Sequence, residues 1–167
     1  MELLRSVARP VEDGRLIFKG GTSLSKAYAI IERFSEDVDV LVAPSEGLGA
    51  GRRDRMLKAV AARAADDLRL APRLLTSTTG VKRDVVYEYP AAYPDPGRLS
   101  SGVLPEMGIR GGPEPHELRE VRSYLALAAI ESGVPADAFE ESAPVSILTL
   151  RPERTLVEKL ALLHDRA

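Results

Sequence analysis

Two glycines and two aspartates carry the residue types that could handle a phosphorylated ligand. Gly20 and Gly21 follow the run LIFK, and Asp37 and Asp39 open the stretch DVDVLV. On a strand, residues i and i+2 point to the same side with Cα atoms about 6–7 Å apart, so the two carboxylates could share a cation. Hard oxygen ligands favour Mg²⁺ or Mn²⁺. The spacing predicts a metal site, although such pairs also occur on wet strand faces.

The glycine pair suits a backbone that approaches a ligand closely. Glycine removes the side chain from such a turn, and the first amides of a following helix attract phosphate oxygens. Thr22 and Ser23 add hydroxyl donors. A plain tight turn with a capped helix is the alternative for these glycines taken alone. If the helix packs back across the sheet, the aspartate strand returns beside the strand that ends at Gly20, and the carboxylates lie next to the phosphate cradle.

The periodicity of apolar residues predicts the elements that position these groups. Alternating or compact apolar runs predict strands, and a spacing of three to four predicts helices. We expect strands at 15–20, 37–42, 81–90, 102–110 and 143–150, and helices at 24–34, 54–68, 123–133 and 152–167. Pro105 should confine its strand to an edge or a bulge. The fold class is therefore α/β, with helices packed on a mixed sheet in a single domain over 1–167.

Composition narrows the class of protein. The 167 residues include 44% hydrophobic residues and no cysteine, which fits a compact fold without disulfides or a cysteine zinc site. No apolar run is long enough to span a bilayer, and the N-terminus lacks the apolar core of a secretory signal. We expect a soluble cytoplasmic protein that does not act at a membrane.

Positive charge is concentrated in the segment Gly51–Arg83. Nine lysines and arginines stand there against three acids, a net charge of +6, whereas the whole chain has −2 and the remainder therefore −8. Such a surface could follow a phosphate backbone. A solvated helix face is the alternative.

The last predicted helix reaches Ala167 without a glycine, asparagine or proline stop signal. Its apolar positions Leu156, Leu160 and Leu163 call for further structure to cover them. We therefore expect that the chain is truncated at its C-terminus relative to the natural protein, or that a partner covers this face.

The stretch Lys19–Val42 resembles the nucleotidyltransferase superfamily, whose polymerase β-like core joins a glycine loop, a helix and an Asp-x-Asp strand. More narrowly, KGGTSLSKAY with RFSEDVDV resembles the AbiEii family, the toxins of AbiE-type toxin–antitoxin systems, and is similar to the MenT toxins. That family also carries a lysine followed by an arginine or lysine on a late helix. Here EKLALLHDR supplies Lys159 and Arg166. The family's later Arg-Asp-x-x-Asp pattern is not present in this sequence.

The resemblance implies roles for individual residues. Asp37 and Asp39 would hold Mg²⁺ or Mn²⁺ for an NTP substrate bound at Gly20, Gly21, Thr22 and Ser23. Glu106 is the candidate third carboxylate, with Glu88 as the alternative.

Four further side chains complete the expected set. Lys159 would contact the triphosphate with help from Arg166, while Lys26 faces either the phosphates or solvent. Ser35, expected to be exposed, would be a regulatory point at which an added phosphate repels nucleotide.

The implied activity is metal-dependent transfer of nucleotides from NTP to an RNA acceptor, the tRNA 3′ end, which blocks translation. The basic segment would hold the acceptor, and an antitoxin would be the protein partner. Two alternatives remain open. The acceptor could be a protein or a small molecule, or the chain could be a degenerate, non-catalytic domain that binds an antitoxin.

Overall fold

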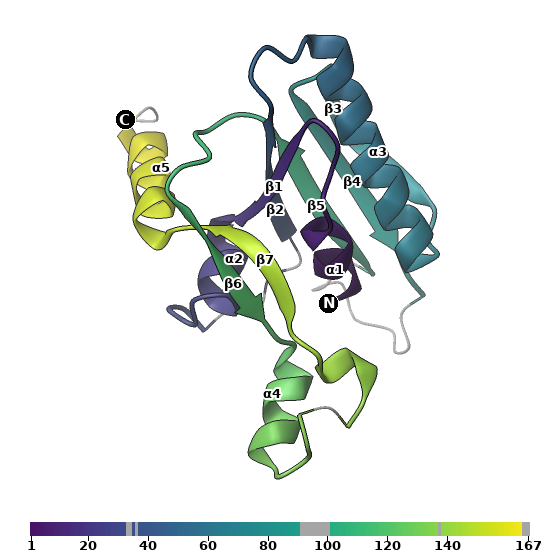
Figure 1. The fold of residues 1–167 in the computed structure, drawn as a ribbon, viewed down its shortest axis with the longest axis vertical. Helices are drawn as coiled ribbons and strands as arrows, with labels where there is room; N and C mark the ends of the chain where they lie inside the picture. Colours follow the sequence, from purple (N-terminus) through teal and green to yellow (C-terminus); the bar gives the residue numbers. More distant parts are fainter. Residues whose placement is uncertain (33–34, 36, 91–100, 137, 165–167) are drawn as a thin grey trace.

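The computed structural model describes residues 1–32, 35, 37–90, 101–136 and 138–164. Seven strands form one mixed sheet in the order β3-β4-β5-β2-β1-β7-β6 (Figure 1). The strands are β1 (Gly14–Lys19), β2 (Asp37–Pro44), β3 (Pro72–Thr78), β4 (Lys82–Glu88), β5 (Gly102–Gly108), β6 (His116–Val121) and β7 (Val145–Leu150). The β1–β2, β3–β4, β4–β5 and β6–β7 pairs are antiparallel, and the β2–β5 and β1–β7 pairs are parallel. The predicted α/β mixed sheet is confirmed.

The helices are α1 (Glu2–Ala8), α2 (Gly20–Lys26), α3 (Ala50–Leu68), α4 (Tyr124–Glu131) and α5 (Pro152–His164), with a short 3-10 helix η1 (Glu140–Ser142). Helices α1 and α3 lie on one face of the sheet, and α4 with η1 projects beyond the end of the β6–β7 pair (Figure 1). In the part of the chain described, no helix is long and apolar enough to cross a membrane.

The period of two in β2 divides its side chains between the two faces of the sheet. Val38, Val40 and Val42 are buried in the main core together with residues of α1 and α3. Leu41 belongs instead to a small cluster with Ile17 and Leu150. Since neighbouring residues of a strand point to opposite sides, Asp39 shares the face of Leu41. The carboxylates therefore lie on the face opposite α3.

Strand β5 lies inside the sheet, between β4 and β2, and pairs with both without a shift of register, so the expectation that Pro105 confines it to an edge or a bulge is wrong. On the β2 side Pro105 pairs in register with Val38. On the β4 side the ladder is interrupted, with pairs at Asp84–Glu106 and Tyr87–Val103 and none assigned between them. Proline has no N–H to donate, which accounts for the gap. The sheet tolerates this interruption because the β2 side continues to pair through Pro105.

Helix α2 is shorter than predicted and begins earlier. It starts at Gly20 rather than at 24, and ends at Lys26. The Arg119 guanidinium of β6 donates to the Ala27 carbonyl at 3.0 and 3.2 Å, and Ala29 is left-handed with φ +52°. A tertiary contact therefore occupies the carbonyl that a longer helix would have used. Arg33 and Phe34, the end of the predicted helix, lie outside the described residues.

The other predicted elements are present with shifted ends. Helix α3 begins at Ala50 instead of 54, and Pro152 opens α5 as expected. Ser123 caps α4, accepting a hydrogen bond from the Ala126 N–H at 3.0 Å. Helix α1 and strands β3 and β6 were not predicted. All seven residues of β3 are exposed, so its sequence carries no burial pattern.

Candidate functional site

Four charged residues are in register across one face of the sheet. Lys19 on β1 pairs with Asp39 on β2, and Asp39 pairs with Glu106 on β5. Glu106 in turn pairs with Asp84 on β4. Residues paired across strands project to the same side. We call Lys19, Asp39, Glu106 and Asp84 the charged row; it shows that the aspartate strand returns beside the strand that ends at the glycine pair, as predicted.

A cavity of about 280 Å³ opens over this row. Its charged lining residues are Lys19, Asp39, Lys82, Glu106 and Arg110. Three cations thus stand around two carboxylates, an arrangement that suits a ligand with phosphate groups and a cation. We call this space the carboxylate cavity.

The electrostatics of the cavity centre on Glu106 and Lys82. Burial raises the pKa of Glu106, the nearby Lys82 lowers it, and the carboxylates of Asp39, Asp84 and Asp37 raise it again. The Lys82 ammonium lies 2.7 Å from Asp84 Oδ2 and 4.0 Å from Glu106 Oε2. Its pKa is raised, chiefly by the hydrogen bond with Asp84. The row therefore concentrates negative charge that lysine only partly offsets.

The Asp39 side chain leaves no room for a side chain at position 20. The φ of Gly20 is +75°, and a Cβ at this position would lie 2.0 Å from Asp39 Oδ2. No side chain larger than hydrogen fits there unless the carboxylate moves. The glycine at the end of β1 thus allows the Asp39 carboxylate to lie against the backbone where the strand passes into α2.

The hydroxyls next to the glycines bond within the protein. Thr22 donates to the Asp37 carbonyl at 2.5 Å and hydrogen-bonds to Ser35 Oγ at 2.7 Å. Ser23, fully buried, donates to the Gly20 carbonyl at 2.8 Å. Ser35 is half-buried and also accepts from the Asp37 N–H at 3.2 Å, so the expectation that it is exposed is wrong. Thr22 and Ser35 thus connect the start of β2 to α2, whereas Ser23 bonds within α2.

The other predicted residues are placed as follows. Asp37 is exposed at the start of β2 and belongs to the same side of the strand as Asp39. Lys26 lies 4.0 Å over the Tyr124 ring, directed toward α4 rather than the charged row, and burial lowers its pKa. Glu88 pairs with Gly102 in the sheet and forms an ion pair with Arg73, away from the carboxylate cavity.

Helix α5 brings a different side chain to the row than the sequence indicated. Lys159 is exposed. Its neighbour Glu158 accepts a hydrogen bond from the Lys19 ammonium at 3.2 Å. Arg166 lies outside the described residues.

Comparison with known families identifies the chain. A family model described as nucleotidyl transferase AbiEii toxin, type IV toxin–antitoxin system, matches residues 2–167. The chain belongs to the AbiEii nucleotidyl transferase toxin family. Membership implies nucleotidyl transfer as the reaction class and an antitoxin as partner. Comparison with curated proteins and with solved structures gives no match.

The donor set of this AbiEii chain fits a hard divalent cation. Among the residues described, no three aspartate, glutamate, histidine or cysteine side chains converge as a metal-binding group. Mg²⁺, however, is usually held by one or two carboxylates together with substrate phosphates and water. Asp39 and Glu106 are adjacent in register, and the raised pKa of Glu106 marks a carboxylate that a cation would stabilise in its charged form.

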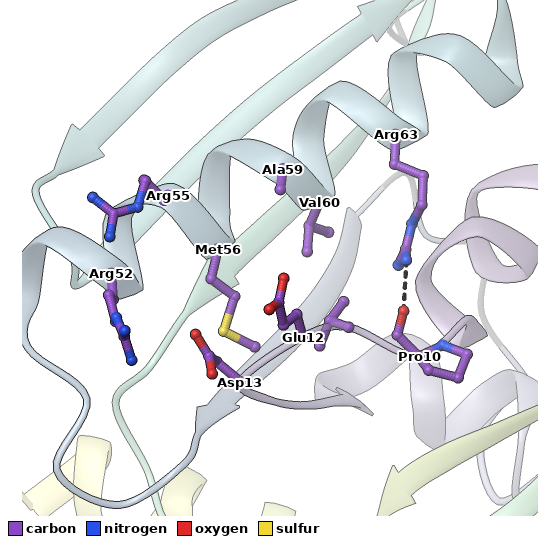
Figure 2. A pocket seen from close by; sticks show the side chains of 10 residues that line it. Pro10, Glu12, Asp13, Arg52, Arg55, Met56, Ala59, Val60 and Arg63 are labelled. Carbon is purple, nitrogen blue, oxygen red and sulfur yellow. Dashed lines mark hydrogen bonds between the residues drawn. The ribbon is translucent and has the colours of Figure 1, made fainter.

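A second, larger cavity of about 550 Å³ lies between α3 and the segment that precedes β1 (Figure 2). Arg52 and Arg55 stand on its α3 side, and Glu12 and Asp13 on the other. Arg63 closes one end by donating to the Pro10 carbonyl at 2.8 Å (Figure 2). The basic segment is thus partly matched by acids, and its helix lies on the face of the sheet opposite the charged row.

Several site residues were missed from the sequence, namely Lys19, Lys82, Asp84, Arg110 and Glu158. Each stands near a motif, but its role depends on which strands become neighbours. Alternation in VKRDVVYEYP could have placed Lys82 and Asp84 on one face of a strand. Only the sheet order puts that face beside Asp39 and Glu106.

Proposed function

We propose that this AbiEii toxin transfers nucleotides from an NTP to an RNA acceptor, the 3′ end of tRNA, and thereby blocks translation in the cytoplasm. The observation that carries the proposal is the carboxylate cavity, in which Asp39 and Glu106 lie side by side among Lys19, Lys82 and Arg110. Polyphosphate recognition requires fixed cations, and phosphoryl chemistry requires carboxylates that hold a metal between substrate oxygens.

In this proposal Asp37, Asp39 and Glu106 hold Mg²⁺ or Mn²⁺. The metal would neutralise phosphate charge and help to orient the reacting oxygens. The exposed place of Asp37 at the start of β2 makes it the outermost of the three. Lys19, Lys82 and Arg110 bind the triphosphate from the walls of the cavity. Gly20 leaves the space in which the Asp39 carboxylate lies, so it acts by positioning.

The reaction is an in-line displacement. The acceptor hydroxyl oxygen forms a bond to the α-phosphorus, the bond from that phosphorus to the bridging oxygen breaks, and pyrophosphate leaves. Glu106 accepts the proton of the attacking hydroxyl. The cations around the cavity offset the charge that passes to the pyrophosphate oxygens. Lys159 and Arg166 are further triphosphate contacts by resemblance to the family. Ser35 is a regulatory position by its place next to the acidic strand, where an added phosphate would repel nucleotide.

The acceptor approaches from the first turn of α3. Gly80, in the turn between β3 and β4, packs against Ala50 at the start of that helix, where an added Cβ would lie 2.4 Å from the Ala50 carbonyl oxygen. Thr78 and Val81 on either side of this turn line the carboxylate cavity. An RNA strand held by the arginines after Ala50 could therefore pass over the turn to reach Glu106.

Labelled substrates test the proposal. The chain is incubated with Mg²⁺, total tRNA and each of the four α-labelled NTPs in turn, and label is followed into RNA, protein and small molecules. We expect label in tRNA, dependent on Mg²⁺. Asp39→Ala and Asp37→Ala should abolish incorporation and growth inhibition while leaving the fold nearly intact.

Each alternative has its own outcome in this assay. Label in protein or in a small molecule would support transfer to a different acceptor. No incorporation from any NTP, together with binding of the cognate antitoxin, would support a degenerate binding domain. Wild-type rates in Asp39→Ala would overturn the site assignment.

A further inference from the structure

We propose that Glu158 of α5 is a positioning residue that fixes the Lys19 ammonium for the nucleotide phosphates. This inference rests on the proposed function, because Lys19 acts only if the carboxylate cavity binds a triphosphate. Its starting observation is the ion pair between Lys19 Nζ and Glu158 Oε2 at 3.2 Å. The two residues are 139 positions apart in the sequence. Both side chains are about three-quarters buried, at 23% and 25% exposure, so solvent screens the pair less than an exposed one.

Lys19 is tied to the reaction centre by the sheet. It is the last residue of β1, stands in register with Asp39 and lines the carboxylate cavity. Its backbone is therefore fixed, whereas its four-carbon stem has many rotamers. A second contact has to select among those rotamers if the ammonium is to meet phosphate in one place. Glu158 is the partner that the structure provides.

Glu158 has a second charged neighbour, and a glycine lies close to it. Arg154, one helical turn earlier, lies with Nε 3.5 Å from Glu158 Oε1. Gly111 has φ +102°, and a Cβ there would lie 2.9 Å from the same oxygen and 4.0 Å from Lys19 Nζ. The backbone between β5 and β6 thus comes close to this ion pair at a residue without a side chain. A side chain at position 111 would therefore collide with the Glu158 carboxylate that accepts from Lys19.

The chemistry of the pair suits orientation rather than neutralisation. An ammonium group carries three N–H donors, and the bond to Glu158 uses one of them. The other two can point to phosphate oxygens. Binding energy for the triphosphate then increases because the conformational entropy of Lys19 has been lost before the nucleotide arrives. Loss of Glu158 should weaken NTP binding and leave the chemical step mostly intact.

The test compares Glu158→Gln, which keeps shape and removes charge, with Glu158→Asp, which keeps charge. Initial rates of tRNA labelling are measured against the concentration of each NTP that the wild-type chain uses. We expect Glu158→Gln to raise KM about tenfold with kcat within about threefold of wild type. Glu158→Asp should recover part of the loss. Glu153→Gln is the matched control, since Glu153 is on the same helix but pairs with Arg151 at 3.0 Å, and it should behave as wild type.

A double-mutant cycle separates positioning from a structural role. In the Lys19→Met background Glu158 has no ammonium to orient, so Glu158→Gln should add less than about twofold to KM. An equal loss with and without Lys19 would show that Glu158 only stabilises α5, and would overturn the inference. Wild-type KM in Glu158→Gln would overturn it as well while leaving the proposed function standing. If the wild-type chain labels no acceptor from any NTP, both the proposed function and the positioning role of Glu158 are wrong.

Discussion

At the scale of the residue, Gly20 and Asp39 depend on each other. Any residue other than glycine would be strained at the positive φ of position 20. In addition, the Asp39 carboxylate occupies the space that a Cβ at this position would need. Gly20→Ala should therefore abolish nucleotide transfer and lower the free energy of unfolding by more than about 1 kcal/mol. Urea denaturation and the labelling assay measure both.

Gly47 offers a matched control for this substitution. It has the same φ of +75°, but no atom lies within 4 Å of an added Cβ. Gly47→Ala should show the backbone cost alone, about 1 kcal/mol, with full transfer activity. If both variants transfer nucleotide equally well, the absence of a side chain at position 20 is not required to position the Asp39 carboxylate for the reaction.

Glu106 makes stability depend on pH. Its pKa is higher in the folded chain, mainly through burial and neighbouring carboxylates, so the folded state binds more protons between the unfolded and folded pKa values. The free energy of unfolding then falls as pH rises through that window. In EDTA, Glu106→Gln should be more stable than wild type at pH 7, and the difference should vanish below about pH 4. Urea midpoints across pH measure this, with Glu46→Gln, on an exposed loop, as the control.

A constant difference between Glu106→Gln and wild type at every pH would contradict this account. The gain would then come from packing and not from removal of a charge. Addition of Mg²⁺ at pH 7 should reduce the advantage of the variant, because a cation bound at Glu106 stabilises the charged form of the wild type.

At the scale of the element, a hydrogen bond from Tyr87 connects α3 to the sheet. This side chain on β4 is fully buried, donates to the Ala61 carbonyl at 2.7 Å and has its pKa raised to about 12 by burial. Tyr87→Phe should lower the free energy of unfolding by about 1 kcal/mol without loss of transfer. Tyr89→Phe, on an exposed tyrosine, should be neutral. A neutral Tyr87→Phe would mean that packing alone holds the helix.

The elements that sequence predicts well are those whose burial follows a simple period. Alternation identifies β2 because Val38 and Val40 face the main core, and the glycine pair marks the end of β1. The end of α2 could not be predicted, since it depends on Arg119, which reaches Ala27 from a strand 92 residues away. The expectation of an edge or a bulge at Pro105 was wrong, because a rule based on the missing N–H of proline does not show that the other side of the strand still pairs.

The residues of the candidate site also fall into those that the sequence predicts and those that it does not. Asp37, Asp39 and the glycines are readable because they lie within one local motif. Glu106 could be proposed, but its place next to Asp39 follows from the order of strands. Lys82 and Glu158 depend on contacts between distant segments, so the motif spacing alone could not predict them.

At the scale of the whole molecule, the α3 part of the basic segment and the charged row lie on opposite faces of the sheet, and the β3–β4 turn lies next to both. Substitution of Arg52, Arg53 and Arg55 by glutamate reverses three charges, so it should weaken tRNA binding and reduce the salt dependence of that binding. Each lost phosphate contact removes about 0.7–0.9 from the slope of log affinity against log salt. KM for NTP should not change. Filter binding across salt concentrations measures the slope, and an unaltered slope would mark the segment as a solvated helix face.

The ion pair between Lys19 and Glu158 also affects the order in which the residues of the site come together during translation. The β1–β2 pair can form as soon as the first 44 residues are available, whereas Glu106 joins only with β5. Lys19 meets Glu158 only after α5 has been made. Because chains fold as they emerge from the ribosome, a nascent chain places Asp39 early but has no partner for the Lys19 ammonium on α5 until that helix has emerged. A ribosome translating this chain would therefore have to complete α5 before the Lys19–Glu158 ion pair could form.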